Sequence, residues 1–372
     1  MDKYYEEAEA VIAQVKRVVI GKDTCIQKAM AAILAGGHIL IEDIPGVGKT
    51  TLARAFSNAM DLESRRIQFT PDVMPSDLVG FSMYQKKEDQ FIYQPGAVMC
   101  NLFLGDEINR TSPKTQSALL EVMEEGSATV DGVTRKVPRP FVVMATQNPV
   151  GSVGTQKLPE SQLDRFMICM TMGYPELEDE IAIAKGKSLG VDVELIEPVI
   201  SAAELIVLQE KTADVFVEDS IYRYICNLVQ ASRQNGYIAL GLSPRATLAL
   251  VTMAKAIAFL HRRDYVVPED VAEIFLDVSA HRILLNAKAR AGHMSAADVL
   301  KELLQKEKKP VSEKIDSSRC RETGDPKEID PSRCKETGDP KEIDQSGCKE
   351  SGEINEKRDC LRDNNCHHLL YG

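Results

Sequence analysis

The stretch from residue 39 to residue 51 has the sequence Ile-Leu-Ile-Glu-Asp-Ile-Pro-Gly-Val-Gly-Lys-Thr-Thr. A continuous apolar run, a glycine-containing loop, a lysine and two hydroxyl residues predict a buried strand, a phosphate-binding loop and the start of a helix. In such a loop the backbone amides and the helix N-terminus surround a β-phosphate, the lysine reaches the β- and γ-phosphates, and the next hydroxyl holds Mg²⁺. We therefore predict a metal ligand at Thr50 and nucleotide contacts at Asp43, Pro45, Gly46, Val47, Gly48, Lys49, Thr50 and Thr51.

One position departs from the usual loop pattern, because Asp43 stands where a first glycine is common. The alternative interpretation is a glycine-rich turn that caps a helix and leaves Lys49 in solvent.

Polar residues also follow two further apolar runs. Leu102-Phe103-Leu104 leads to Asp106 and Glu107, and Phe141 to Met144 leads to Asn148. Asp106 would bind Mg²⁺ through water, and Glu107 would orient and polarise the attacking water. The Asn148 amide could hold that water or contact a γ-phosphate. The alternatives are a solvated Asp-Glu pair and an Asn-Pro turn that closes a strand.

These continuous apolar runs alternate with helical patterns over residues 1–175, which predicts an α/β domain with a parallel sheet between helices. The strand signal disappears over residues 176–309, where periodicity predicts a small all-α domain with helices at 246–260 and 268–285. Alternation around Asp131-Gly132 predicts a hairpin over residues 128–134, and residues 81–93 suggest a second one more weakly.

Composition limits the class of protein. With 372 residues and 44% apolar content, the chain can form at least two domains with cores. The net charge of −11 argues against a protein dedicated to binding a polyanion. We find no secretory signal over residues 1–9 and no apolar run long enough to span a bilayer. We therefore expect a cytoplasmic protein without a membrane span, in which the isolated cysteines 25, 100, 169 and 226 are core residues.

The last segment, residues 310–372, differs from the rest. It contains a 14-residue repeat that begins at Ser318, Ser332 and Ser346, and it carries 11 Lys or Arg and 15 Asp or Glu residues. Such a composition cannot bury enough apolar surface to offset ordering, so we expect a disordered tail. A metal site at its cysteines and histidines is a weaker alternative.

With the three strand ends in order, the chain resembles the AAA+ ATPases, and specifically the MoxR family, from about Val11 to Ile283. Residues 41–50 are similar to that family's Walker A loop, in which the first glycine is often replaced. Residues 106–125 are similar to its Walker B strand and following helix, and residues 145–149 to sensor 1 with Asn148 in the sensing role. Residues 158–166 are similar to the arginine-finger segment, with Arg165 as the finger, and residues 243–246 to sensor 2, with Arg245 on the lid.

The resemblance implies an oligomer, expected to be a hexamer, because an AAA+ finger acts on the γ-phosphate of the neighbouring subunit. A surface salt bridge of Arg165 to Asp164 or Glu160 is the alternative. Arg245 would close onto the nucleotide and report its state, and Arg110 is equally consistent with a subunit contact and a structural ion pair. The two hairpins look like inserts of the subgroup that contains the magnesium-chelatase motor subunit. In that subgroup Lys86, Lys87, Arg135 and Lys136 would face a pore, although solvated hairpin tips are the simpler interpretation.

These features favour a ring-forming, Mg²⁺-dependent ATPase that remodels or matures a client protein or metal-cofactor complex. The family resemblance adds a von Willebrand factor A-domain protein as an expected partner. A DNA-acting motor and a non-hydrolysing nucleotide-dependent scaffold are the alternatives, and the net charge makes a nucleic-acid partner the weaker choice.

Overall fold

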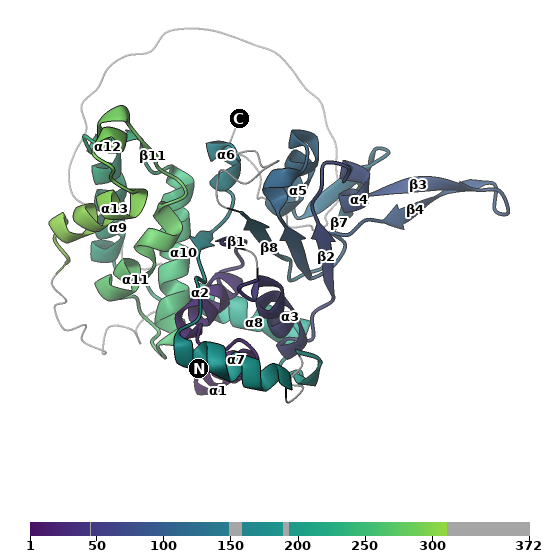
Figure 1. Ribbon diagram of the computed structural model, residues 1–372, viewed down its shortest axis with the longest axis horizontal. Coiled ribbons are helices and arrows are strands. Elements are labelled where there is room, and N and C mark those ends of the chain that lie inside the picture. The colour runs from purple at the N-terminus through teal and green to yellow at the C-terminus, as the bar shows by residue number, and fades with distance from the viewer. Residues whose placement is uncertain (45, 149–157, 189–192, 311–372) are drawn as a thin grey trace, which may run out of the picture. The chain divides into compact units, whose positions relative to one another are not determined.

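A computed structural model of the chain describes residues 1–310 except 45, 149–157 and 189–192 (Figure 1). Pro45 and all of the predicted tail except its first residue, Pro310, therefore lie outside the described residues. Among the helices of the described part, none is long and apolar enough to cross a membrane.

Five parallel strands form the central sheet in the order β2-β5-β8-β1-β9. Their bounds are β1 (Ile39–Glu42), β2 (Ser64–Gln68), β5 (Leu102–Asp106), β8 (Val142–Gln147) and β9 (Ile168–Met170). The three apolar runs are β1, β5 and β8, as predicted. β2 and β9 were not predicted, because the exposed and half-buried side chains of β2 give no apolar run and β9 has only three residues.

Helices cover both faces of the sheet, as Figure 1 shows. Ile39 and Ile41 belong to a core cluster with α1 (Asp2–Lys16), α2 (Asp23–Leu34) and α3 (Lys49–Ala59). Leu40 belongs to a second cluster on the opposite face, with α5 (Pro113–Glu125). Because successive strand side chains point to opposite faces, burial on both faces requires the continuous apolar sequence of β1.

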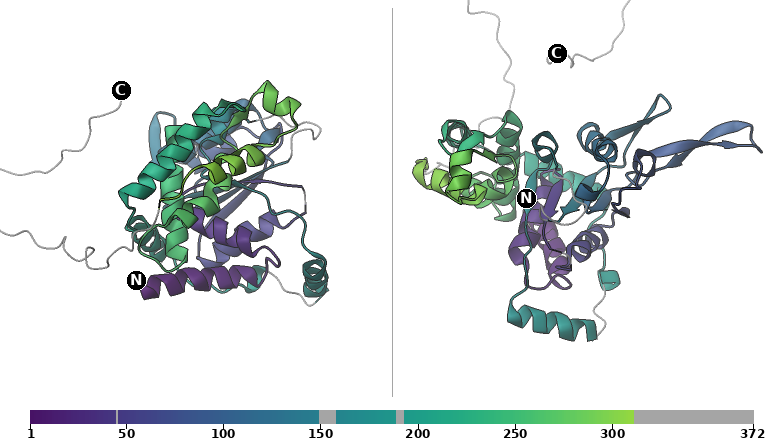
Figure 2. Two further views of the ribbon diagram at one scale, coloured as in Figure 1. Left: turned by 90° about the vertical axis from the view of Figure 1, so that its left-hand side faces the viewer. Right: turned by 45° about the horizontal axis from the view of Figure 1, so that its top comes forward.

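Both predicted hairpins are confirmed. The first pairs β3 (Gly80–Gln85) with β4 (Gln90–Pro95), and the second pairs β6 (Ser127–Val130) with β7 (Val133–Lys136). Asp131 and Gly132 both have positive φ, 53° and 74°, as the tight turn of the second hairpin requires. The hairpin β3–β4 extends away from the sheet, as Figure 1 and the right-hand view of Figure 2 show.

The lid is helical, as expected. It contains α8 (Ala202–Ala213), α9 (Asp219–Gln234), α10 (Pro244–Leu260), α11 (Pro268–Ser279), α12 (Ala287–Ala291) and α13 (Ala296–Lys306). α10 packs against α2, α8, α9 and α11, so the core of the first helical layer continues into the lid. The remaining elements are α4 (Pro75–Val79), α6 (Glu160–Leu163), α7 (Leu177–Ser188) and the short 3₁₀ helices η1 (Ile108–Arg110) and η2 (Val193–Leu195).

Three details of the sequence-based prediction were wrong. The lid contains a short antiparallel pair, β10 (Ile238–Leu240) with β11 (Leu284–Leu285), where no strand was expected. The helix predicted over residues 268–285 ends at Ser279, because Leu284 and Leu285 are extended and pair with β10. Cys226 is exposed rather than part of the core, whereas Cys100 is buried and Cys25 and Cys169 are half-buried.

Candidate nucleotide-binding site

The phosphate loop joins the carboxyl end of β1 to α3. Gly46 and Gly48 have φ of 87° and 93°, a left-handed conformation that glycine adopts without a steric cost. Gly48 is the N-cap of α3, so the first amides of that helix, beginning at Lys49, Thr50 and Thr51, have no partner within the helix. Free amides together with the helix dipole make this end of α3 suited to an anion such as phosphate.

A cavity of about 320 Å³ lies in front of this helix end. It brings together residues from the loop and from three strand ends, and its lining residues are Gly46, Gly48, Lys49, Thr50, Thr51, Gln68, Asp106, Glu107, Thr146 and Asn148. Eight of the residues predicted from the sequence therefore meet here, although 99 positions separate Lys49 from Asn148. Val47 is half-buried against the core beside the loop and is not among the lining residues.

Asp43 also lies outside the lining, and its carboxylate contacts backbone. Oδ1 accepts from the amide of Ile44 at 2.8 Å, and Oδ2 accepts from the amides of Met172 and Gly173, each at 2.6 Å. The side chain thus ties the phosphate loop to the segment that follows β9. The backbone carbonyl of Asp43 accepts a hydrogen bond from Lys49 Nζ at 2.7 Å, which places that ammonium inside the loop.

The Lys49 ammonium is the main positive charge of the cavity. Burial lowers the pKa of Lys49, and the carboxylates of Asp43, Asp106 and Glu107 oppose this shift. Three carboxylates close to one ammonium leave the site in need of further positive charge once phosphates enter it, and a divalent cation can supply it.

The Walker B pair is held by polar partners on both sides. Asp106 is 6% exposed, and its Oδ2 accepts from Arg66 Nε at 2.7 Å. The Thr146 hydroxyl donates to Asp106 Oδ1 at 3.3 Å and accepts from the backbone amide of Glu107 at 3.0 Å. These contacts fix the Asp106 carboxylate and the backbone of Glu107 at the end of β5.

Glu107 has a backbone φ of 58°, which is unusual for a residue with a side chain and is enriched at functional sites. Its Oε2 accepts from Arg110 Nη1 at 2.6 Å. This hydrogen bond, aided by one from the Asn148 side chain, lowers the pKa of Glu107. The carboxylate is thus ionised at neutral pH, as an acceptor that orients a water must be. Of the two interpretations of Arg110, the ion pair within the chain is the one present in this structure.

Sequence reasoning missed three residues of the site. Arg66 and Gln68 come from β2, the polar edge strand, and Thr146 lies two residues before Asn148. Ser64 to Gln68 include a single apolar residue, Ile67, so the sequence gives no strand signal for β2, and no local pattern marks Thr146.

Arg165 and Arg245 lie near the amino ends of the parallel strands, at the edge of the sheet opposite the phosphate loop. Arg165 Nη2 is 2.9 Å from Glu124 Oε2, and Arg245 Nη2 is 2.5 Å from Glu124 Oε1. Next to Glu124, the Met123 carbonyl accepts from Nε2 of His38, the residue just before β1, at 3.1 Å. The phosphate loop follows the other end of β1, about 13 Å away. Neither arginine is among the described residues that line the cavity.

The predicted basic hairpin residues are placed as follows. Lys86 and Lys87 lie in the turn between β3 and β4, and both are exposed. The guanidinium of Arg135 stacks over the ring of Tyr93 with its carbon 3.9 Å from the ring centroid, so this side chain links the two hairpins. Lys136 ends β7 and is exposed.

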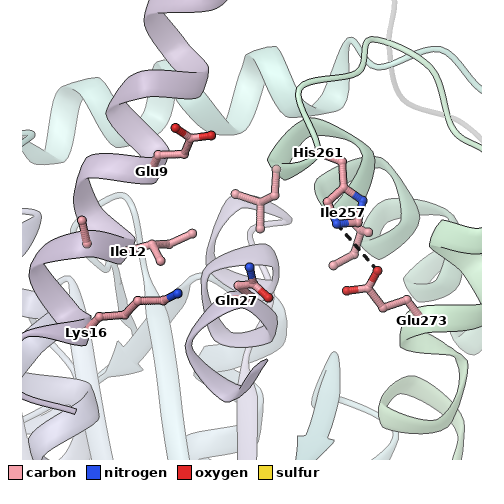
Figure 3. Close-up of a pocket in the computed structure, with 9 residues that line it drawn as sticks. Glu9, Ile12, Lys16, Gln27, Ile257, His261 and Glu273 are labelled. Carbon is pink, nitrogen blue, oxygen red and sulfur yellow. Dashed lines mark ion pairs between the residues drawn. The ribbon is translucent and has the colours of Figure 1, made fainter. Parts of the chain in front are cut away.

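A second cavity, of about 270 Å³, opens between α1, α2, α10 and α11 (Figure 3). Its rim carries Glu9, Lys16, His261 and Glu273, with 3.8 Å between His261 Nε2 and Glu273 Oε2. It contains none of the predicted nucleotide-site residues and no glycine loop, so we place the nucleotide in the cavity at α3.

Comparison with known proteins agrees with this geometry. Residues 38–168 match the family model described as "ATPase family associated with various cellular activities (AAA)", and residues 230–303 match the AAA lid domain. YeaC of Bacillus subtilis is 46% identical over 300 residues, which cover 81% of this chain and 94% of that protein. The chaperone MoxR1 of Mycobacterium tuberculosis is 38% identical over 306 residues, covering 80% of this chain and 81% of the relative. A crystal structure from Cytophaga hutchinsonii, described as that of a candidate ATPase, superposes with a TM-score of 0.77 at 37% identity and covers 83% of this chain and 96% of that one.

The fold and the phosphate loop thus define a P-loop ATPase of the AAA+ class, with a parallel five-stranded sheet and a helical lid. Within that class, the chain belongs to the MoxR family.

Proposed function

We propose that this protein binds ATP with Mg²⁺ in the cavity at α3 and hydrolyses it to ADP and phosphate. The observation that carries the proposal is the meeting of Lys49, Thr50, Asp106, Glu107 and Asn148 in one cavity. The loop amides and Lys49 would hold the β- and γ-phosphates, as the free amides of α3 support.

Thr50 and Asp106 would hold Mg²⁺, with Asp106 acting through water. A hydroxyl and a buried carboxylate lining the same cavity fit the oxygen ligands that this ion prefers. When bound, the ion neutralises charge on the β- and γ-phosphate oxygens. Glu107 would orient the attacking water, with Asn148 as the second group on that water, and the hydrogen bond from Asn148 to Glu107 supports this pairing.

We further propose that the chain acts as a ring, expected to be a hexamer, in which Arg165 and Arg245 serve the nucleotide of a neighbouring subunit. Their place at the far edge of the sheet, paired with Glu124, supports this role, because about 13 Å of strand separates that edge from the phosphate loop of the same chain. The expected place of action is the cytoplasm, with residues 1–175 as the nucleotide-binding domain, 176–309 as the lid domain and 310–372 as a tail.

The work of the ring would be chaperone-like remodelling or maturation of a client protein or metal-cofactor complex, aided by a von Willebrand factor A-domain partner. The name of the Mycobacterium tuberculosis relative, a chaperone, supports the general role. A pull-down with the Glu107→Gln variant, which would hold ATP without hydrolysing it, is expected to enrich the client.

The hydrolysis proposal is tested by the turnover of the same variant. Glu107→Gln is expected to lower ATP turnover by roughly 10²- to 10⁴-fold, the range typical for loss of a general base, while nucleotide binding persists. Glu121→Gln is the matched control, since Glu121 is exposed on α5 and does not line the cavity. Unchanged turnover in Glu107→Gln would refute the role of Glu107.

A further inference from the structure

One buried side chain, Arg282, fastens the turn that carries Arg165 to the lid. Arg282 is 5% exposed and lies between α11 and β11. Its Nε donates to Asp164 Oδ1 at 2.8 Å, and its Nη1 donates to the Met167 carbonyl at 3.0 Å. Its Nη2 donates to the carbonyls of Asp164 and Phe166 at 3.2 and 2.6 Å. Carbonyls on both sides of Arg165 therefore accept from the same guanidinium.

Asp164 connects a second lid element to this turn. Its carboxylate oxygens lie 3.1 and 3.0 Å from the Ser243 hydroxyl, which donates to them. Ser243 is also the N-cap of α10 and accepts from the amide of Ala246. Arg245 lies in the first turn of that helix, so the positions of Arg165 and Arg245 are both set through Asp164.

Attachment of the lid does not by itself require this cluster of contacts. α10 already packs on α2 through a continuous apolar core, which is the larger source of attachment. What Arg282 adds is the placement of the backbone at residues 164–167. A guanidinium is suited to this because it offers five N–H donors in a fixed plane, whereas a lysine ammonium offers a single nitrogen.

We propose that Arg282 is a positioning residue that couples the lid to the arginine finger. Because Arg282 and Ser243 bond the turn at residues 164–167 to the lid, the approach of Arg165 to the γ-phosphate of the next subunit depends on the position of the lid. The inference rests on the proposed function, in which Arg165 acts on a neighbour.

The first test is Arg282→Lys in the full chain. This substitution keeps the positive charge but removes the planar set of N–H donors. Arg165 is therefore misplaced, while the phosphate loop is unchanged. Turnover of the assembled protein is expected to fall on the order of a hundredfold, as a misplacement of about 1 Å can cause. The affinity of the variant for a fluorescent ATP analogue stays at the level of the unmodified protein.

Arg290→Lys is the matched control. Arg290 belongs to the same lid, and its guanidinium also donates to a backbone carbonyl, that of Leu285, at 3.1 and 2.8 Å. Both partners lie within the lid, so this variant is expected to retain full turnover.

Mixed rings separate a positioning role from a purely structural one. Glu107→Gln subunits cannot hydrolyse ATP but carry an intact finger, and Arg282→Lys subunits have an intact cavity. Mixing the two is expected to restore turnover, because a Glu107→Gln neighbour supplies a correctly placed Arg165 to the Arg282→Lys cavity. The same mixture with Arg165→Ala in place of Arg282→Lys tests the proposed function itself.

Three results would overturn the inference. The first is full turnover of Arg282→Lys alone. The second is that mixing with Glu107→Gln restores the turnover of Arg165→Ala but not that of Arg282→Lys. Failure of both mixtures would refute the finger acting between subunits and this inference with it. If Arg282→Lys does not fold, Asp164→Asn replaces it in the same mixture, because it weakens the hydrogen bond between Arg282 and Asp164 from the aspartate side. The same three results then test the inference.

Discussion

Replacing Asp43 by Asn tests whether the aspartate that stands in place of the first Walker A glycine has a structural role. Asp43 is 7% exposed, and its carboxylate accepts hydrogen bonds from three backbone amides, those of Ile44, Met172 and Gly173. An Asn side chain of the same shape offers one oxygen instead of two. In its best orientation that oxygen keeps the amides of Met172 and Gly173, and its NH₂ faces the amide of Ile44.

The cost follows from these contacts. One hydrogen bond to a charged group is lost, worth about 1.5–3 kcal/mol, and the other two lose their charge assistance. Cheaper burial of the neutral amide offsets part of this loss. We expect Asp43→Asn to lower the free energy of unfolding by about 2–4 kcal/mol.

Urea titration measures this change. The chain has no Trp, so far-UV circular dichroism is the suitable signal. Asp72→Asn is the control, because Asp72 is exposed in the loop after β2. A stability within about 0.5 kcal/mol of the unmodified protein, the usual range for surface substitutions, would refute the role assigned to the Asp43 carboxylate.

Two further predictions concern stability. Burial lowers the pKa of His38 to about 4 from 6.5, so the unfolded chain binds more protons between these values and stability falls as pH drops below 6.5. His38 therefore contributes about 2 kcal/mol to the difference in unfolding free energy between pH 7 and pH 5. Urea titrations of His38→Gln at both pH values are expected to show a difference smaller by this amount. An unchanged difference would contradict the lowered pKa of His38. Glu124→Gln breaks the ion pairs to Arg165 and Arg245, but the Glu124 side chain is 38% exposed. We therefore expect a change below about 1 kcal/mol per pair by the same titration, and a loss of several kcal/mol would show that the pairs are buried in the working protein.

Most of the cavity was predictable from the sequence because its parts lie next to strong local patterns. Lys49, Asp106 and Asn148 each follow an apolar run, and the carboxyl ends of parallel strands meet at one edge of a sheet. The β6–β7 hairpin was predictable for a similar reason, since Asp131-Gly132 encodes the turn directly.

The remaining contacts depend on residues that are distant in the chain. Arg66 reaches Asp106 across 40 positions, and Arg282 reaches Asp164 across 118. The residues next to each arginine in the sequence do not distinguish a side chain with a buried partner from a solvated one. Only the pairing of β2 with β5 and the packing of the lid on the core decide otherwise.

Local sequence specifies the phosphate loop, the parallel sheet and the helical lid, because backbone propensity and burial act on residues that are close in the chain. The tertiary structure decided where the two arginines lie. Arg165 and Arg245 come from segments 80 positions apart and meet on Glu124, at the edge of the sheet opposite the phosphate loop. Their common location is set by long-range hydrogen bonds to Asp164, which no local pattern encodes.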